Sequence, residues 1–206
     1  MLSAAAHELR GPLGVARGYL RLLAQQGGGD ARATRAVEQA GQATDRMAVL
    51  VEEISAYARL ASGEIRMLPK PVPLADVLGP AAERAAVPAD APVRVRVEIP
   101  SDLTISVDGA RLTDACAAMV AALARAQVGE TVIVVTAEAA ASRGRVTVRI
   151  TVASGLDAPC EERALRVGRS GAGLSLAMAE LTVRLHQGTT HECWAGANWI
   201  GYVVRL

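Results

Sequence analysis

A histidine stands near the start of the chain, within the run His7-Glu8-Leu9-Arg10-Gly11-Pro12-Leu13. An imidazole nitrogen is a good nucleophile near neutral pH and can carry a phosphoryl group as a phosphoramidate. The carboxylate of Glu8 can accept the ring proton as a general base. The guanidinium of Arg10 can contact phosphoryl oxygens or an acidic partner. These three side chains predict phosphoryl transfer centred on His7.

Three glycines share a helical face with His7, namely Gly11, Gly14 and Gly18. A glycine inside a helix costs roughly 1 kcal/mol relative to alanine, so three of them need a reason. A stripe without side chains below the histidine would let another helix dock closely, and we interpret it as a partner groove. The alternative is that the glycines merely pack tightly inside a helical bundle.

Two helices are predicted to present these residues. Each has an apolar seam with steps of three and four. The first seam comprises Leu9, Leu13, Ala16, Leu20 and Leu23, and the second comprises Val37, Ala40, Thr44, Met47, Val51, Ile54 and Ala58. The segment 25–30 predicts a turn, in which Asp30 caps the second helix. A hairpin with so wide an apolar face needs a second copy, so we expect a homodimeric four-helix bundle.

A run with three prolines in residues 68–73 ends the helical pattern and predicts a linker at 67–73. It separates a hairpin, residues 1–66, from a second domain, residues 74–206. Helices are predicted at 74–87, 110–127 and 174–186. Strands are predicted at 93–99, 105–107, 131–137 and 145–152, followed by a hairpin of 189–195 and 199–206. This mixture predicts a two-layer α/β sandwich.

Composition narrows the choice of partners and compartment. Half of the residues are hydrophobic and the net charge is +1, so nothing favours nucleic acid or an anionic membrane. No apolar run approaches the ~20 residues of a membrane span, and the first residues lack the pattern of a signal peptide. We therefore expect a cytoplasmic protein. Three widely spaced cysteines fit reduced thiols, and no spacing indicates a metal site.

The run at His7 resembles the phosphoacceptor box of bacterial sensor histidine kinases, H-E-L-R-(T or N)-P-L. The segment 47–64 resembles the second helix of the same family. Residues 107–112 resemble the lead-in to its asparagine box, and residues 171–177 resemble its last glycine box, G-x-G-L-G-L-A. These motifs follow the family's order along the whole chain. The resemblance implies an antiparallel helical hairpin that dimerises, followed by an α/β sandwich of the kinase ATPase type.

The sequence departs from the family where nucleotide binds. Two asparagines of the family face the triphosphate, and one binds Mg²⁺; the matching positions are Ala118 and Ala122, whose methyl groups offer no oxygen ligand. Ser154 stands near the position at which the family has an aspartate that contacts adenine. Gly171 and Gly173 remain at a helix start, either as a vestigial phosphate loop or as a simple tight turn.

Gly11 is a further departure, because the family places threonine or asparagine there and links that side chain to phosphatase action. The resemblance therefore carries no phosphatase activity over to this chain.

Three functions follow from the resemblance. The favoured one is a histidine phosphotransfer protein that exchanges a phosphoryl group between His7 and the aspartates of response-regulator receiver domains. It needs no cofactor of its own, and an upstream kinase is a further partner. The first alternative is a weak or unconventional kinase that phosphorylates His7 with ATP and Mg²⁺. The second is a pseudokinase that docks a regulator without chemistry.

Overall fold

The structure is a computed structural model that describes residues 2–25, 31–85, 92–140, 145–167 and 173–206, with the backbone alone described for residues 2–10, 12, 22, 24, 32 and 33. The chain divides into two compact units, Met1–Arg66 and Met67–Leu206. The turn predicted at 25–30, with its capping residue Asp30, lies outside the described residues.

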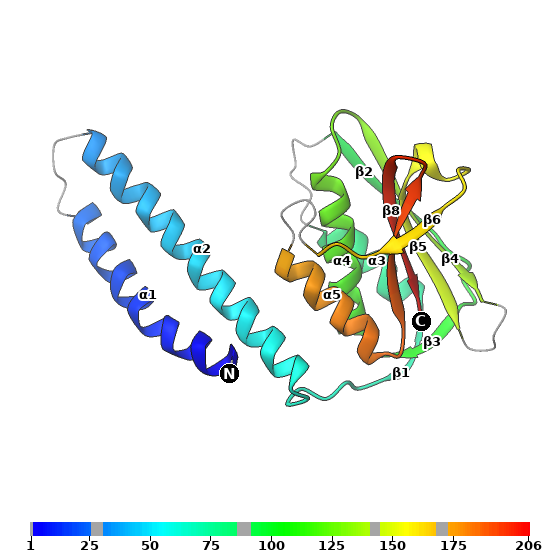
Figure 1. The fold of residues 1–206 in the computed structure, drawn as a ribbon, viewed down its shortest axis with the longest axis horizontal. Helices are drawn as coiled ribbons and strands as arrows, with labels where there is room; N and C mark the ends of the chain where they lie inside the picture. The colour runs from blue at the N-terminus through cyan, green and yellow to red at the C-terminus, as the bar shows by residue number, and fades with distance from the viewer. Residues whose placement is uncertain (1, 26–30, 86–91, 141–144, 168–172) are drawn as a thin grey trace. The chain divides into compact units, whose positions relative to one another are not determined.

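The first unit is a hairpin of two long helices, α1 (Leu2–Gln25) and α2 (Ala31–Ala61), which run side by side (Figure 1). Both predicted helices are confirmed. Thr44 and Val51 are buried along the α2 seam. An ion pair between Arg17 Nε and Asp45 Oδ1, at 2.8 Å, joins the two helices on the exposed side.

The second unit is built on a six-stranded sheet with the strand order β2-β4-β5-β8-β7-β6. Strands β2 and β4 run parallel, and the other neighbours run antiparallel. The strands are β2 (Val93–Glu98), β4 (Thr131–Ala139), β5 (Val146–Val152), β6 (Glu161–Ala164), β7 (Thr189–Ala195) and β8 (Asn198–Arg205). A separate two-stranded sheet pairs β1 (Lys70–Pro73) with β3 (Thr104–Val107).

Three helices cover one face of the large sheet, as Figure 1 shows: α3 (Ala75–Arg84), α4 (Gly109–Arg125) and α5 (Gly173–Leu185). Strand β2 alternates as predicted, since its valines are partly buried against the core and its charged residues are exposed. Val148 and Ile150 of β5 are fully buried beneath the helices. The predicted two-layer α/β sandwich is confirmed.

Two short strands differ from the sequence prediction. Residues 70–73, predicted as linker, pair with β3 in the register Lys70↔Val107, because only one edge of this short strand needs partners and prolines are tolerated at such an edge. Strand β6, between β5 and α5, was not predicted. Its residues are polar and do not alternate, and it is a strand because β7 offers it a partner.

The cysteines also differ from the prediction. Cys160 and Cys193 form a disulfide, with their Cα atoms 5.3 Å apart, whereas three reduced thiols were expected. The physical reason is the β6–β7 pairing, in which Glu162 lies opposite Cys193 and Cys160 stands just before β6. Thirty-three residues separate the two cysteines in sequence, so their spacing carried no signal of this contact. Cys116 is a free, buried thiol on α4.

Candidate functional site

Helix α1 carries all three residues predicted to perform chemistry. His7, Glu8 and Arg10 lie within Leu2–Gln25, so a continuous helical backbone extends on both sides of the histidine. The positions of their side chains lie outside what the structure describes. The assignments of His7 as phosphoacceptor, Glu8 as general base and Arg10 as a phosphoryl contact therefore stay predictions.

The glycine stripe next to His7 is open surface. Gly11, Gly14 and Gly18 are exposed, and a Cβ atom added to any of them meets no other atom within 4 Å. The other helix of the same hairpin therefore does not pack against the stripe. The alternative for these glycines was tight packing inside a helical bundle. The helix that packs on them would then have to come from a second copy of the chain.

The two alanines that replace the expected asparagines differ in their surroundings. Both lie on α4, and Ala122 is 0% exposed while Ala118 is partly buried. Neither methyl group offers an oxygen to Mg²⁺. At Ala122 the protein itself fills the space around the methyl, so a ligand would have to displace neighbouring side chains. The residues present at these two positions do not fit a magnesium–triphosphate group.

The segment after β5 is also packed against the sheet. It forms a short 3₁₀ turn, Ala153–Gly155, and a Cβ atom on Gly155 would lie 2.9 Å from Ile200 Cδ1. Ser154, near the position of the family's adenine-contacting aspartate, and Asp157, which could replace that aspartate from a shifted register, are exposed on either side of this buried glycine. Gly173 is the first residue of α5, and Gly171 lies outside the described residues.

Hydrogen bonds around Asp108, which the sequence did not predict, join the start of α4 to the residue after α5 and to the segment before β1. Asp108 caps α4 by accepting a hydrogen bond from the Arg111 N–H at 3.3 Å, and its other oxygen accepts one from the Leu68 N–H at 3.1 Å. The Asp108 N–H donates to His186 Nε2 at 2.8 Å. His186 Nδ1 then donates to the Thr182 carbonyl oxygen at 2.8 Å. The acceptor role of Nε2 requires a neutral ring, so His186 is a structural residue here.

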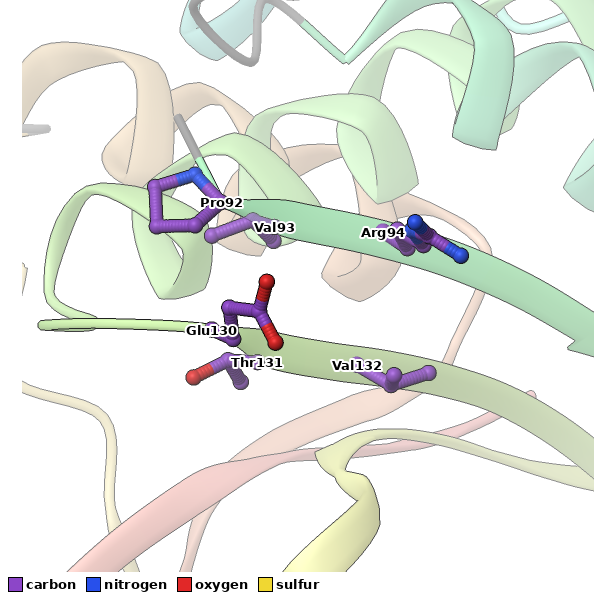
Figure 2. A pocket seen from close by; sticks show the side chains of 6 residues that line it. All are labelled: Pro92, Val93, Arg94, Glu130, Thr131 and Val132. Carbon is purple, nitrogen blue, oxygen red and sulfur yellow. The ribbon is translucent and has the colours of Figure 1, made fainter. Parts of the chain in front are cut away.

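A pocket lies where β2 and β4 begin (Figure 2). Its lining comprises Pro92, Val93, Arg94, Glu130, Thr131 and Val132. The Glu130 carboxylate points toward β2, and Arg94 lies further along that strand (Figure 2). One charge of each sign favours neither an anion nor a cation, and we assign this pocket no function.

Two features are absent from the residues that the structure describes: a metal-binding cluster and a membrane-spanning helix. No cluster of three or more histidine, cysteine, aspartate or glutamate side chains there could hold a metal ion. Across the same residues, no helix has the length and apolar character needed to cross a membrane.

Comparison with known proteins identifies the first unit. Residues 1–63 match the family model described as the His Kinase A (phospho-acceptor) domain, a range that contains His7 and all of the described hairpin up to Gly63. None of the curated proteins matches the sequence significantly. The hairpin is therefore similar to the phospho-acceptor domain of histidine kinases.

Solved structures show that the fold of the chain is also that of histidine kinases. Full-length ShkA in complex with AMPPNP is 21% identical with a TM-score of 0.70, over 99% of this chain and 44% of ShkA. The histidine kinase AdeS of Acinetobacter baumannii is 15% identical with a TM-score of 0.62, over 97% of this chain and 96% of AdeS. The mycobacterial sensor histidine kinase MprB is 19% identical with a TM-score of 0.51, over 67% of this chain and 95% of MprB.

The chain thus spans less than half the length of ShkA and nearly the whole of the AdeS structure. A phospho-acceptor hairpin followed by an α/β sandwich fits the two-component histidine kinase family, and the resemblance noted in the sequence is confirmed.

Proposed function

We propose that the protein is a cytoplasmic histidine phosphotransfer protein. His7 takes a phosphoryl group from the aspartate of one phosphorylated receiver domain and passes it to the aspartate of another. The receiver domain supplies its own metal ion, and its aspartate supplies the phosphoryl group. The reaction therefore needs no nucleotide bound to this chain. A sensor kinase upstream would phosphorylate the first receiver.

The observation that carries the proposal is the contrast between the two units. The first unit matches a phospho-acceptor domain over residues 1–63 and keeps the His7 motif. In the second unit, the two positions aligned with the family's asparagines are Ala118 and Ala122, and the methyl of Ala122 is fully enclosed. A chain that keeps an acceptor and has methyl groups at these two positions is suited to receiving phosphoryl groups from other proteins rather than from ATP.

A second function is favoured by one observation. The fold over 99% of the chain is similar to that of ShkA, whose solved structure holds AMPPNP. A weak kinase that phosphorylates His7 with ATP is therefore the competing proposal. The two are separated by calorimetric titration of the whole chain with ATP and Mg²⁺. Binding in the micromolar range would favour the kinase, and no binding at millimolar ATP would remove it.

Phosphotransfer itself is tested by following a labelled phosphoryl group. Receiver domains are phosphorylated with a labelled low-molecular-weight phosphodonor, separated from it and mixed with the protein. The expected product is a label on the protein that survives alkali, as a phosphohistidine does and an aspartyl phosphate does not. His7→Ala should accept none, while His191→Ala serves as the matched control because His191 lies on β7 of the second unit. Equal labelling of His7→Ala would overturn the proposal.

The hairpin has the features of one half of a dimeric bundle. Val15, Tyr19 and Leu23 follow one another at steps of four on α1, and they are 54–66% exposed. Met47 and Leu50 add exposed apolar surface on α2. Because so much apolar side chain facing water is unfavourable, we include a homodimer in the proposal, with a second hairpin covering this face.

The glycine stripe is the proposed docking surface for the receiver domain. Gly14→Ala adds a methyl where nothing lies within 4 Å, and it removes the helical cost of glycine, so the free protein should gain up to about 1 kcal/mol in stability. Receiver binding should weaken at the same time. Gly41→Ala on α2, which also meets nothing within 4 Å, is the matched control. Undiminished receiver binding by Gly14→Ala would exclude the stripe as the groove.

A further inference from the structure

Strand β6 is the least supported element of the large sheet. It has four residues, lies at the sheet edge and pairs only with β7. A short edge strand gains little from backbone hydrogen bonds alone, since water competes for them. The segment from Cys160 to Val167 therefore depends on further contacts with β7 and β8.

Three fastenings hold this segment, beside the Arg163 guanidinium, which donates to the Gly196 carbonyl oxygen and lies over the Trp194 ring, and the partly buried Leu165 and Val167. The disulfide joins Cys160 to Cys193 on β7. The carboxylate of Glu162 receives two hydrogen bonds from the guanidinium of Arg205 on β8. Beyond β6, the Arg166 N–H donates to Glu192 Oε1 at 3.0 Å, and Glu192 is 1% exposed.

The three fastenings differ in kind. The two polar ones form by themselves on folding. The disulfide is covalent, and it is the only one that a chemical reaction can open and close.

The two sulfurs of the bond differ in accessibility. Cys193 is 1% exposed, while Cys160 is partly exposed at the start of the edge strand. Cys160 is therefore the half of the bond that an external thiolate would approach. Cys116 does not compete, because it is buried on α4, where burial raises the pKa of its thiol to about 12 and keeps it protonated.

We propose that Cys160 and Cys193 form a reversible redox site whose disulfide fastens β6 to β7, with a dithiol reductant as its co-substrate. A thiolate of the reductant attacks Cys160 Sγ, the Cys160–Cys193 bond breaks, and Cys193 leaves as a thiolate that takes up a proton. The second thiol of the reductant then attacks the mixed disulfide and releases Cys160. The reductant ends as its own disulfide, having supplied two electrons and two protons. Oxidation by a disulfide runs the same steps in reverse.

Opening the bond should loosen the segment without unfolding the unit. The segment would keep the Glu162–Arg205 and Arg166–Glu192 contacts but lose its attachment at the end nearest to the 3₁₀ turn.

The test uses the whole chain equilibrated in buffers of oxidised and reduced dithiothreitol. The protein is quenched with acid and unfolded so that the buried Cys116 can also react; free thiols are then alkylated, and the protein is digested and analysed by mass spectrometry. Oxidised protein should yield a linked peptide containing Cys160 and Cys193, with only Cys116 alkylated. In hydrogen exchange, reduction should speed the amides of residues 161–164 by about tenfold or more while those of β5 change little.

Variants separate the bond from general damage. Cys160→Ser in oxidising buffer should exchange like the reduced wild type, and Cys193→Ala should do the same if the serine variant folds poorly. Cys116→Ala is the matched control and should still give the linked peptide. The proposal is overturned if no linked peptide forms, if the bond opens only in denaturant, or if reduction leaves exchange at residues 161–164 unchanged.

Discussion

Replacing Ala122 by asparagine puts back the side chain that a magnesium-binding helix would carry. In this protein the methyl of Ala122 is 0% exposed on α4, so the three added heavy atoms have no free space. Ala118, one helical turn earlier, is only partly buried. The pair of variants Ala122→Asn and Ala118→Asn therefore compares the same chemical change in an enclosed and an open setting.

The expected magnitudes differ clearly. At Ala122 a buried amide without partners costs about 1 to 3 kcal/mol, and forcing extra atoms into a packed core costs about 1 to 3 kcal/mol more. At Ala118 the amide can reach water, and the main cost is the helix propensity of asparagine, roughly 0.5 kcal/mol. We therefore expect Ala122→Asn to lose about 2 to 6 kcal/mol in the free energy of unfolding, and Ala118→Asn less than about 1 kcal/mol.

Urea unfolding followed by tryptophan fluorescence reads out the second unit alone, because both tryptophans of the chain, Trp194 and Trp199, lie on β7 and β8. With an m value of about 2 kcal/mol per molar urea, the midpoint of Ala122→Asn should fall by about 1 to 3 M. Calorimetry with Mg²⁺ and ATP should detect no binding to either variant. An Ala122→Asn protein as stable as Ala118→Asn that binds nucleotide would refute the reasoning, because position 122 would then open onto a ligand site.

Three further outcomes are expected. Gly201→Ala should cost at least about 3 kcal/mol in urea unfolding, since φ is +152° and the new Cβ would meet a β5 carbonyl oxygen; a loss below 1 kcal/mol would contradict this. Tyr19→Glu should shift the chain from dimer to monomer in light scattering, whereas Val128→Glu, at a 98% exposed loop position, should leave the mass unchanged. Hydrogen bonds from Arg205 hold the pKa of Glu162 below its ordinary value of 4.5, so this pair stabilises the unit above that pH and its contribution is lost as the pH falls through the lowered pKa. Arg205→Gln should therefore cost about 1 kcal/mol at neutral pH and lose less stability than wild type on acidification, as unfolding at pH 7 and 3 would show.

The sequence predicted the elements whose signal is local. The seams of α1 and α2 repeat every three or four residues, and the valines of β2 alternate with charged residues, so the pattern of each element identified its type. The motif at His7 was likewise local. Strand β6 and the disulfide could not be predicted this way, because Cys160 and Glu162 meet partners that lie 33 and 43 residues away in sequence.

The candidate site shows the same division. That Ala118 and Ala122 offer Mg²⁺ no ligand is evident from their side chains alone. That one of them is enclosed and the other partly open depends on how α5 and the sheet pack around α4, which no pattern within α4 reveals. The structural role of His186 was missed for a similar reason, since its partner Asp108 lies 78 residues earlier.

Helix α4 contributes most of its surface to the core of the second unit. A helix that faces a nucleotide must keep a polar stripe on its ligand side, and that stripe contributes little to the core. Here α4 is buried on most of its circumference, by Leu112, Thr113, Ala115, Cys116, Ala117, Met119, Val120, Ala121, Ala122, Leu123 and Ala124. Small alanines let neighbouring elements approach α4 closely, which adds packing area that stabilises the fold. The proposed function therefore assigns the chemistry to His7 on α1 and a supporting role to the second unit. The packing around Ala122 also explains why a polar side chain introduced at this position should destabilise the second unit rather than create a binding site.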